Sequence, residues 1–158
     1  IEQRLLGLEE GTHTVIELVA GEAFGARAAV RTHSPLFYVH WRLRAGTRAQ
    51  LPAEHPERAA FLVQGRVEVA GQAWEPGRML VFAPGQPVLF TALEDATVML
   101  LGGEPMDGPR HLAWNFVSSR TDRIEQAKRD WLGKRFADVP GETEFIPLPD
   151  NLRPVDYP

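Results

Sequence analysis

The sequence contains no cysteine, no long apolar run and no concentration of basic residues. Without cysteine the chain cannot form disulfides, thiolate metal sites or a thiol nucleophile. No apolar stretch reaches the roughly 18–20 residues that a membrane-spanning helix needs. A net charge of -4 with scattered Lys and Arg disfavours a nucleic-acid surface, because phosphate binding depends on clustered cations. We therefore expect a cytoplasmic protein without direct nucleic-acid or membrane contact.

The length and composition are those of a single globular unit. The 158 residues, 44% of them hydrophobic and 24% charged, suffice to bury one real core. The sequence opens at Ile1 without an initiator Met or a recognisable signal peptide, so we interpret the chain as a fragment or a processed product. No Ser-His-Asp arrangement and no phosphate-binding glycine loop is recognisable, so we predict no catalytic residue.

Short apolar or alternating segments recur across residues 14–101 between Gly and Pro turns, which indicates an all-β sandwich or barrel. In one of them, residues 36–43, the odd-numbered side chains from Phe37 to Leu43 share one face, which we expect to enter the core. The predicted strands are Thr14–Val19, Leu36–Leu43, Arg58–Val63, Arg66–Val69, Met79–Phe82, Val88–Thr91 and Thr97–Leu101.

The periodicity then changes to that of a helix. Ile124, Ala127 and Trp131 lie at i, i+3 and i+7, which predicts a helix that begins at Ser119 and stops at Gly133. The residues after this helix contain too many prolines for a second one, yet they carry large apolar groups. We expect them to form an extended strap over an apolar surface.

Several ordered segments resemble one family, the pirin-like proteins. Those that resemble its C-terminal end are Gly102–Pro105, Trp114–Ser119, Ile124–Trp131 and Val139–Pro149, and those that resemble its second cupin half are Val19–Glu22 and Leu43–Gly46. The resemblance implies a mainly β fold, a cupin-type barrel or jelly roll with a C-terminal helix and strap. It also implies an N-terminal cupin half that holds iron or another divalent metal, and association with quercetin dioxygenase activity or transcriptional co-regulation.

On this basis we divide the chain into an N-terminal extension or linker remnant (1–13), the cupin barrel (14–118) and the C-terminal helix and strap (119–158). The last part has more large apolar groups than it can bury by itself. We therefore predict that it covers another barrel, either a second cupin half or the partner in a homodimer, although it could cover its own barrel. The predicted interface residues are Trp114, Phe116, Trp131, Phe136, Phe145 and Ile146.

Metal-binding cupins share a first motif with two histidines and a glutamate between two glycines. In this chain the frame fits Gly46 and Gly65, and the ligand positions fall on Pro52, Glu54 and Arg58. A divalent metal needs several neutral imidazoles or carboxylates pointing inward, and an arginine among them would repel it. We therefore expect no cofactor in this barrel.

The second cupin motif leads to the same expectation. Gly77 and Gly85 keep its spacing, while Val88 and Ala92 stand at the positions of its histidine and asparagine. The remaining metal alternative is an unorthodox site made by His55 and Glu57, if a local shift turned both inward.

Two further groups are candidates for binding a small ligand. Glu54, Glu57 and Arg58 form either a polar anchor for a small anionic or phenolic ligand, or a structural ion pair at the end of the sheet. Trp41, with the aromatic residues Trp74, Phe82 and Phe90, either lines a pocket for a flavonoid-sized aromatic ligand or fills the core.

These observations support a metal-free cupin module that is structural or binds a small ligand or partner. The alternative is part of a quercetin 2,3-dioxygenase-like enzyme whose metal site lies in a missing N-terminal half or in another chain. A regulatory partner of transcription factors is implied by the family resemblance alone.

Overall fold

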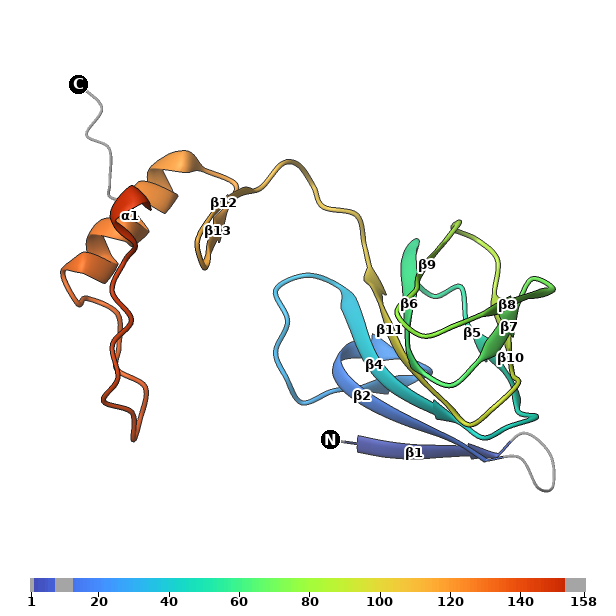
Figure 1. Ribbon diagram of the computed structural model, residues 1–158. Coiled ribbons are helices and arrows are strands. Elements are labelled where there is room, and N and C mark those ends of the chain that lie inside the picture. The colour runs from blue at the N-terminus through green and yellow to red at the C-terminus, as the bar shows by residue number, and fades with distance from the viewer. Residues whose placement is uncertain (1, 8–12, 153–158) are drawn as a thin grey trace. The chain divides into compact units, whose positions relative to one another are not determined.

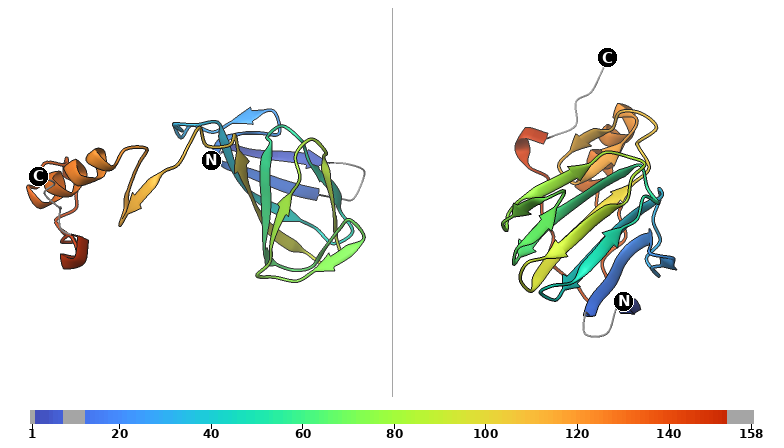
Figure 2. Two further views of the ribbon diagram at one scale, coloured as in Figure 1. Left: turned by 90° about the horizontal axis from the view of Figure 1, so that it is seen from above. Right: turned by 90° about the vertical axis from the view of Figure 1, so that its right-hand side faces the viewer.

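The computed structural model describes residues 2–7 and 13–152, and these residues form two compact units that divide between Pro105 and Met106 (Figure 1). In the first unit two antiparallel sheets face each other, and Figure 2 shows their strands running side by side around a common interior. The second unit contains the described helix.

The larger sheet has the strand order β1-β2-β4-β11-β6-β9, with β3 paired to β2. Its strands are β1 (Glu2–Gly7), β2 (His13–Ala23), β3 (Ala26–Arg27), β4 (Leu36–Leu43), β6 (Glu57–Gln64), β9 (Met79–Phe82) and β11 (Ala96–Gly103). The smaller sheet has the order β5-β10-β7-β8, with β5 (Arg48–Leu51), β7 (Val67–Val69), β8 (Gln72–Trp74) and β10 (Val88–Ala92).

The core lies between the inner faces of these two sheets. On β4 every second residue is buried, and Phe37, Val39, Trp41 and Leu43 all contribute to the core, as the alternation predicts. The residues between them are partly or fully exposed. The neighbouring strand β11 shows the same period, so the two central strands place one row of side chains inside the barrel and one row outside it.

The seven predicted strands are present, but several short strands were not predicted. Strand β5 has only two apolar residues, Ala49 and Leu51, so its alternation is too short to stand out from a loop. Strand β1 pairs with β2, which makes part of the expected N-terminal extension an edge of the larger sheet.

The second unit consists of the hairpin β12 (His111–Ala113) and β13 (Phe116–Ser118), helix α1 (Thr121–Leu132), an extended segment and a short 3-10 turn η1 (Asp150–Leu152). The expected barrel range 14–118 thus included a hairpin that the structure groups with the helix. The helix begins two residues later than predicted, because Ser119 makes no side-chain cap and the N-cap is Arg120. Its C-terminal end at Gly133 is as predicted.

None of the helices in the described part of the chain is both long and apolar enough to cross a membrane.

Candidate functional site: the barrel mouth

Arg58 is the central residue at one end of the barrel, which we call the barrel mouth. It lies on β6, opposite Phe82 of β9 and Gly102 of β11, and only 2% of its surface is exposed. Its Nη1 donates to the carbonyl oxygen of Pro52 at 3.1 Å, and its Nη2 donates to that of Ala83 at 2.7 Å. The guanidinium therefore ties the segment between β5 and β6 to the loop that follows β9.

This arrangement keeps a permanent positive charge inside the mouth. No salt bridge to Arg58 occurs among the described residues, and its buried Nε has no hydrogen-bond partner there. A guanidinium cannot lose its proton at ordinary pH, so the charge stays even without a counter-ion. A divalent metal held close to this group would meet repulsion rather than a ligand.

The other positions of the two cupin motifs do not supply metal ligands either. On β10, Ala92 is buried and Val88 is half-buried, and a hydrocarbon side chain has no lone pair to donate. Among the residues that the structure describes, no group of three His, Asp or Glu side chains could hold a metal. The residues at this position therefore do not fit the metal that the fold family implies.

Of the neighbouring polar residues, Glu54 and His55 have separate backbone partners, and Glu57 has none among the described interactions. An oxygen of Glu54 accepts a hydrogen bond from the backbone N–H of Phe24 at 3.1 Å, and Glu57 is exposed at the start of β6. The expected ion pair of Arg58 with these two carboxylates is absent from the described interactions, because the backbone carbonyls of the mouth loops take the guanidinium instead.

His55 is held in a structural position. Its Nε2 lies 2.9 Å from the carbonyl oxygen of Glu22, and its ring packs on Phe37 with 5.0 Å between centroids. Its Nδ1 is buried without a hydrogen-bond partner among the described residues. No hydrogen bond or ion pair joins the side chains of His55 and Glu57 among the described interactions.

Trp41, predicted either to contact a ligand or to fill the core, fills the core. It is 1% exposed, and its ring contacts Phe90 edge to face at 5.3 Å and Phe24 at 5.9 Å. Phe82 contacts Phe90 in the same way at 5.9 Å. These rings occupy the interior where an open aromatic pocket was the alternative; strand alternation directs Trp41 and Phe90 inward, and Phe24 joins them from the turn between β2 and β3.

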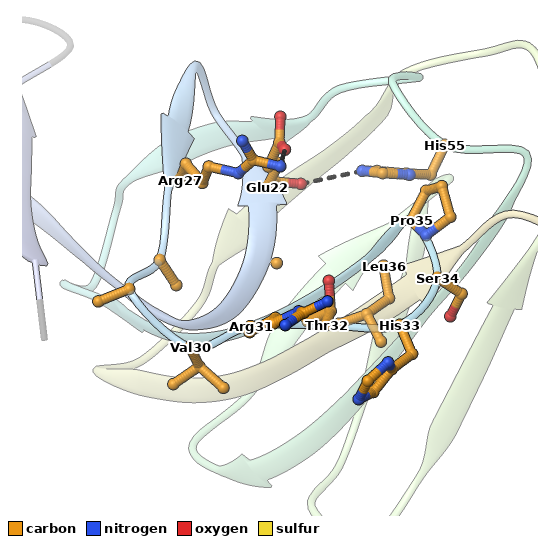
Figure 3. A pocket seen from close by; sticks show the side chains of 13 residues that line it. Glu22, Arg27, Val30, Arg31, Thr32, His33, Ser34, Pro35, Leu36 and His55 are labelled. Atoms are coloured by element: carbon orange, nitrogen blue, oxygen red, sulfur yellow. Dashed lines mark hydrogen bonds and ion pairs between the residues drawn. The ribbon is translucent and has the colours of Figure 1, made fainter.

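A cavity of about 670 Å³ opens beside the mouth, within the size range of small-molecule sites. One wall carries Glu22, Arg27 and His55, and the other is the segment from Val30 to His33, with Pro35 and Leu36 between the walls (Figure 3). This cavity was not predicted from the sequence, because the long loop after β3 matches no motif.

The six predicted interface residues gather in the second unit. The ring of Trp131 on α1 lies 5.1 Å from that of Trp114, 5.7 Å from that of Phe136 and 5.5 Å from that of Phe145. The Trp131 Nε1 donates to the carbonyl oxygen of Ile146 at 2.9 Å, which fixes the strap on the helix. Phe116 also contacts Trp131, at 6.1 Å. The cluster packs on itself, yet most of its members keep substantial exposed surface.

The outer face of the larger sheet is a second apolar surface, and it was not predicted. Cross-strand neighbours continue it from β4 through β11 and β6 to β9, in the rows Tyr38–Leu101–Ala59–Val81 and His40–Met99–Phe61–Met79. We define the outer face by Tyr38, Phe61, Met79, Val81, Met99 and Leu101. Val81 is 79% exposed and Met79 is 51% exposed. His40 and Arg42 border it, both bonded to Glu17.

Comparisons with known proteins address the fold and the ancestry of the chain. A family model described as the pirin C-terminal cupin domain matches residues 38–137. A pirin-like protein of Caulobacter vibrioides is 60% identical over 135 residues, which are 84% of this chain and 46% of that protein. A putative quercetin 2,3-dioxygenase of Pseudomonas aeruginosa is 29% identical over 116 residues, which are 72% of this chain and 37% of that protein.

Solved structures include the same fold. A crystal structure of quercetin 2,3-dioxygenase from Acinetobacter baumannii is 25% identical and aligns with a TM-score of 0.72, covering 96% of this chain and 52% of that one. The predicted mainly β, cupin-type fold is thereby confirmed. This chain spans about half the length of these relatives or less, as the shares of 46%, 37% and 52% show.

Proposed function

Because the chain belongs to the pirin family and matches its C-terminal cupin domain, we propose that it is a metal-free cupin module with a structural and binding role. Its barrel packs against a second cupin barrel and contributes no catalytic residue.

The observation that carries this proposal is the position of Arg58. A guanidinium replaces the carboxylate ligand of the first motif, is buried, and bonds to the Pro52 and Ala83 carbonyls. It thereby makes the connection between mouth loops that a bound ion could otherwise provide. Hydrogen bonds to a charged group contribute about 1.5–3 kcal/mol each, which helps to offset the cost of the buried charge.

Elemental analysis tests the metal-free state directly. The chain is purified without chelators or a polyhistidine tag, and iron, copper, nickel and zinc are measured per chain. The proposal predicts far less than one metal ion per chain. One ion per chain that is lost in His55→Ala or Glu57→Gln would overturn it and make the mouth a metal centre. Glu104→Gln, an exposed carboxylate outside the two motifs, is the control.

The outer face supports the second part of the proposal, the partner barrel. Exposed apolar patches of this extent are typical of interaction surfaces. The relatives are about twice as long as this chain, so their remaining length has room for another barrel. We propose that this barrel covers the outer face, and that a second copy of the chain takes its place when the chain is alone. The apolar cluster around Trp131 in the second unit is a further contact of the same kind.

Sedimentation velocity of the isolated chain tests the partner proposal. We expect a concentration-dependent dimer for the unchanged protein and a monomer for Val81→Glu, because the charge would be buried without a partner. Leu93→Glu, an exposed apolar residue outside the outer face, is the matched control and should remain dimeric. A monomer at all concentrations, or equal dissociation by both variants, would contradict the proposal.

The second candidate is that the module is part of a quercetin 2,3-dioxygenase-like enzyme. The names of two relatives support it, as does the length that they have beyond this chain. In this case the metal and the reacting groups belong to another half or another chain. Quercetin consumption, measured with and without an added metal-loaded N-terminal cupin half, distinguishes the two candidates. Turnover only when that half is added favours the enzyme. No turnover with or without it favours the structural and binding module.

A further inference from the structure

The cavity beside the barrel mouth carries a positive charge that is not neutralised. The one carboxylate in its wall, Glu22, is paired with Arg27 at 2.7 Å. The other guanidinium, Arg31, forms no ion pair or hydrogen bond with any residue that the structure describes. The paired N–H donors of a guanidinium group match the two oxygens of a carboxylate, so Arg31 can bind a carboxylate that enters the cavity.

The rest of the wall combines donors with apolar groups. His33 and the hydroxyls of Thr32 and Ser34 follow Arg31 along the same segment (Figure 3). Val30, Pro35 and Leu36 supply the hydrocarbon surface. Polar and apolar residues contribute about equally to the wall, so the cavity offers both hydrogen-bond donors and hydrocarbon surface to one ligand.

Backbone contacts anchor both ends of the loop that forms the second wall. The N–H of Ala28 donates to the carbonyl of Gly21 at 2.9 Å and closes the base of the loop. Gly21 has a φ of +77°, and a Cβ at this position would lie 1.7 Å from the carbonyl oxygen of Leu36. The neighbouring carbonyl of Glu22 is bonded to His55 at 2.9 Å. The wall with Glu22 and His55 and the two ends of the loop are therefore positioned by backbone contacts.

We propose that this cavity binds a small carboxylate with an apolar body, such as an aromatic acid, with its carboxylate on Arg31 and its body against Val30 and Leu36. This site goes beyond the proposed function and does not depend on it, because none of its groups is a position of either metal motif. Metal analysis and ligand titration therefore succeed or fail separately.

The test is a titration of the full chain followed by NMR of the backbone amides, with benzoate as the probe. Benzamide has the same shape without the charge, and acetate has the charge without the ring. We expect benzoate to shift the amides of residues 30–33, and acetate and benzamide to bind at least about tenfold more weakly, since tenfold corresponds to 1.4 kcal/mol.

Two variants locate the binding. Arg31→Gln should weaken benzoate binding about tenfold or more, because the charge-assisted bonds to the carboxylate are lost. Arg78→Gln removes the same charge from an exposed residue that does not line the cavity, and it should leave the affinity unchanged. Equal binding of benzamide and benzoate, equal losses in the two variants, or no shift at 20 mM benzoate in residues 30–33 would overturn the proposal.

Discussion

The two glycines that frame the first cupin motif should respond differently to the same substitution. Gly46 and Gly65 both have positive φ, +80° and +75°. A Cβ on Gly46 would meet nothing within 4 Å, whereas a Cβ on Gly65 would lie 2.2 Å from the carbonyl oxygen of Asp95. An alanine at Gly46 therefore adds backbone strain alone, while an alanine at Gly65 adds strain and a collision with the turn before β11.

The strain of the left-handed conformation costs an alanine about 1–2 kcal/mol. At Gly65 the collision is roughly 1 Å inside an ordinary carbon–oxygen contact of ~3.3 Å. Such overpacking adds about 1–3 kcal/mol, so Gly65→Ala should lose about 2–5 kcal/mol and Gly46→Ala about 1–2 kcal/mol. Urea unfolding followed by tryptophan fluorescence measures both losses. Equal losses, or a larger loss in Gly46→Ala, would refute the reasoning.

Three further predictions concern the core, the turn before β11 and the second unit. Phe90→Ala should lower the free energy of unfolding by about 3–5 kcal/mol, because the ring is fully buried and contacts two other rings; a thermal unfolding loss below about 1 kcal/mol would contradict this. The backbone N–H of Ala45 and the guanidinium of Arg44 lower the pKa of Asp95. The interactions of Asp95 therefore stabilise the folded protein at pH values above the ordinary carboxyl pKa, and this stabilisation is lost as the pH falls through the lowered pKa of the folded state. The unfolding free energies of the native protein and of Asp95→Asn should therefore converge in acid. A difference independent of pH would refute that assignment. Trp131→Ala should speed hydrogen exchange in the strap by removing the bond to Ile146, and unchanged protection would show that the strap is held otherwise.

The strands that the sequence predicts well are those long enough to show an alternation of apolar and polar residues along their own length. Residues 36–43 alternate over their full length, and the burial of Phe37 and Trp41 follows directly. Strand β5 has too few residues for a period to appear. The end of α1 was predicted more accurately than its start, because Gly133 marks the stop, whereas the predicted start at Ser119 lies two residues before Thr121.

The charged residues of the barrel mouth were named from the sequence, their contacts were not, and their role in ligand binding stays a prediction. The motif frame placed Arg58 at a ligand position from spacing alone. Its two carbonyl acceptors come from segments distant in sequence, at Pro52 and Ala83, so the expected pairing with Glu54 could not be checked without the fold. The outer face was missed for a related reason, since it exists only when β4, β11, β6 and β9 lie in register.

The most direct measurement of the central claim is anomalous diffraction at the nickel absorption edge from crystals of the chain soaked in Ni²⁺. We predict no anomalous peak inside the barrel, and a guanidinium of Arg58 within hydrogen-bonding distance of the Pro52 and Ala83 carbonyl oxygens. A strong peak at the mouth coordinated by Glu54, His55 or Glu57, with Arg58 displaced from those carbonyls, would contradict the account.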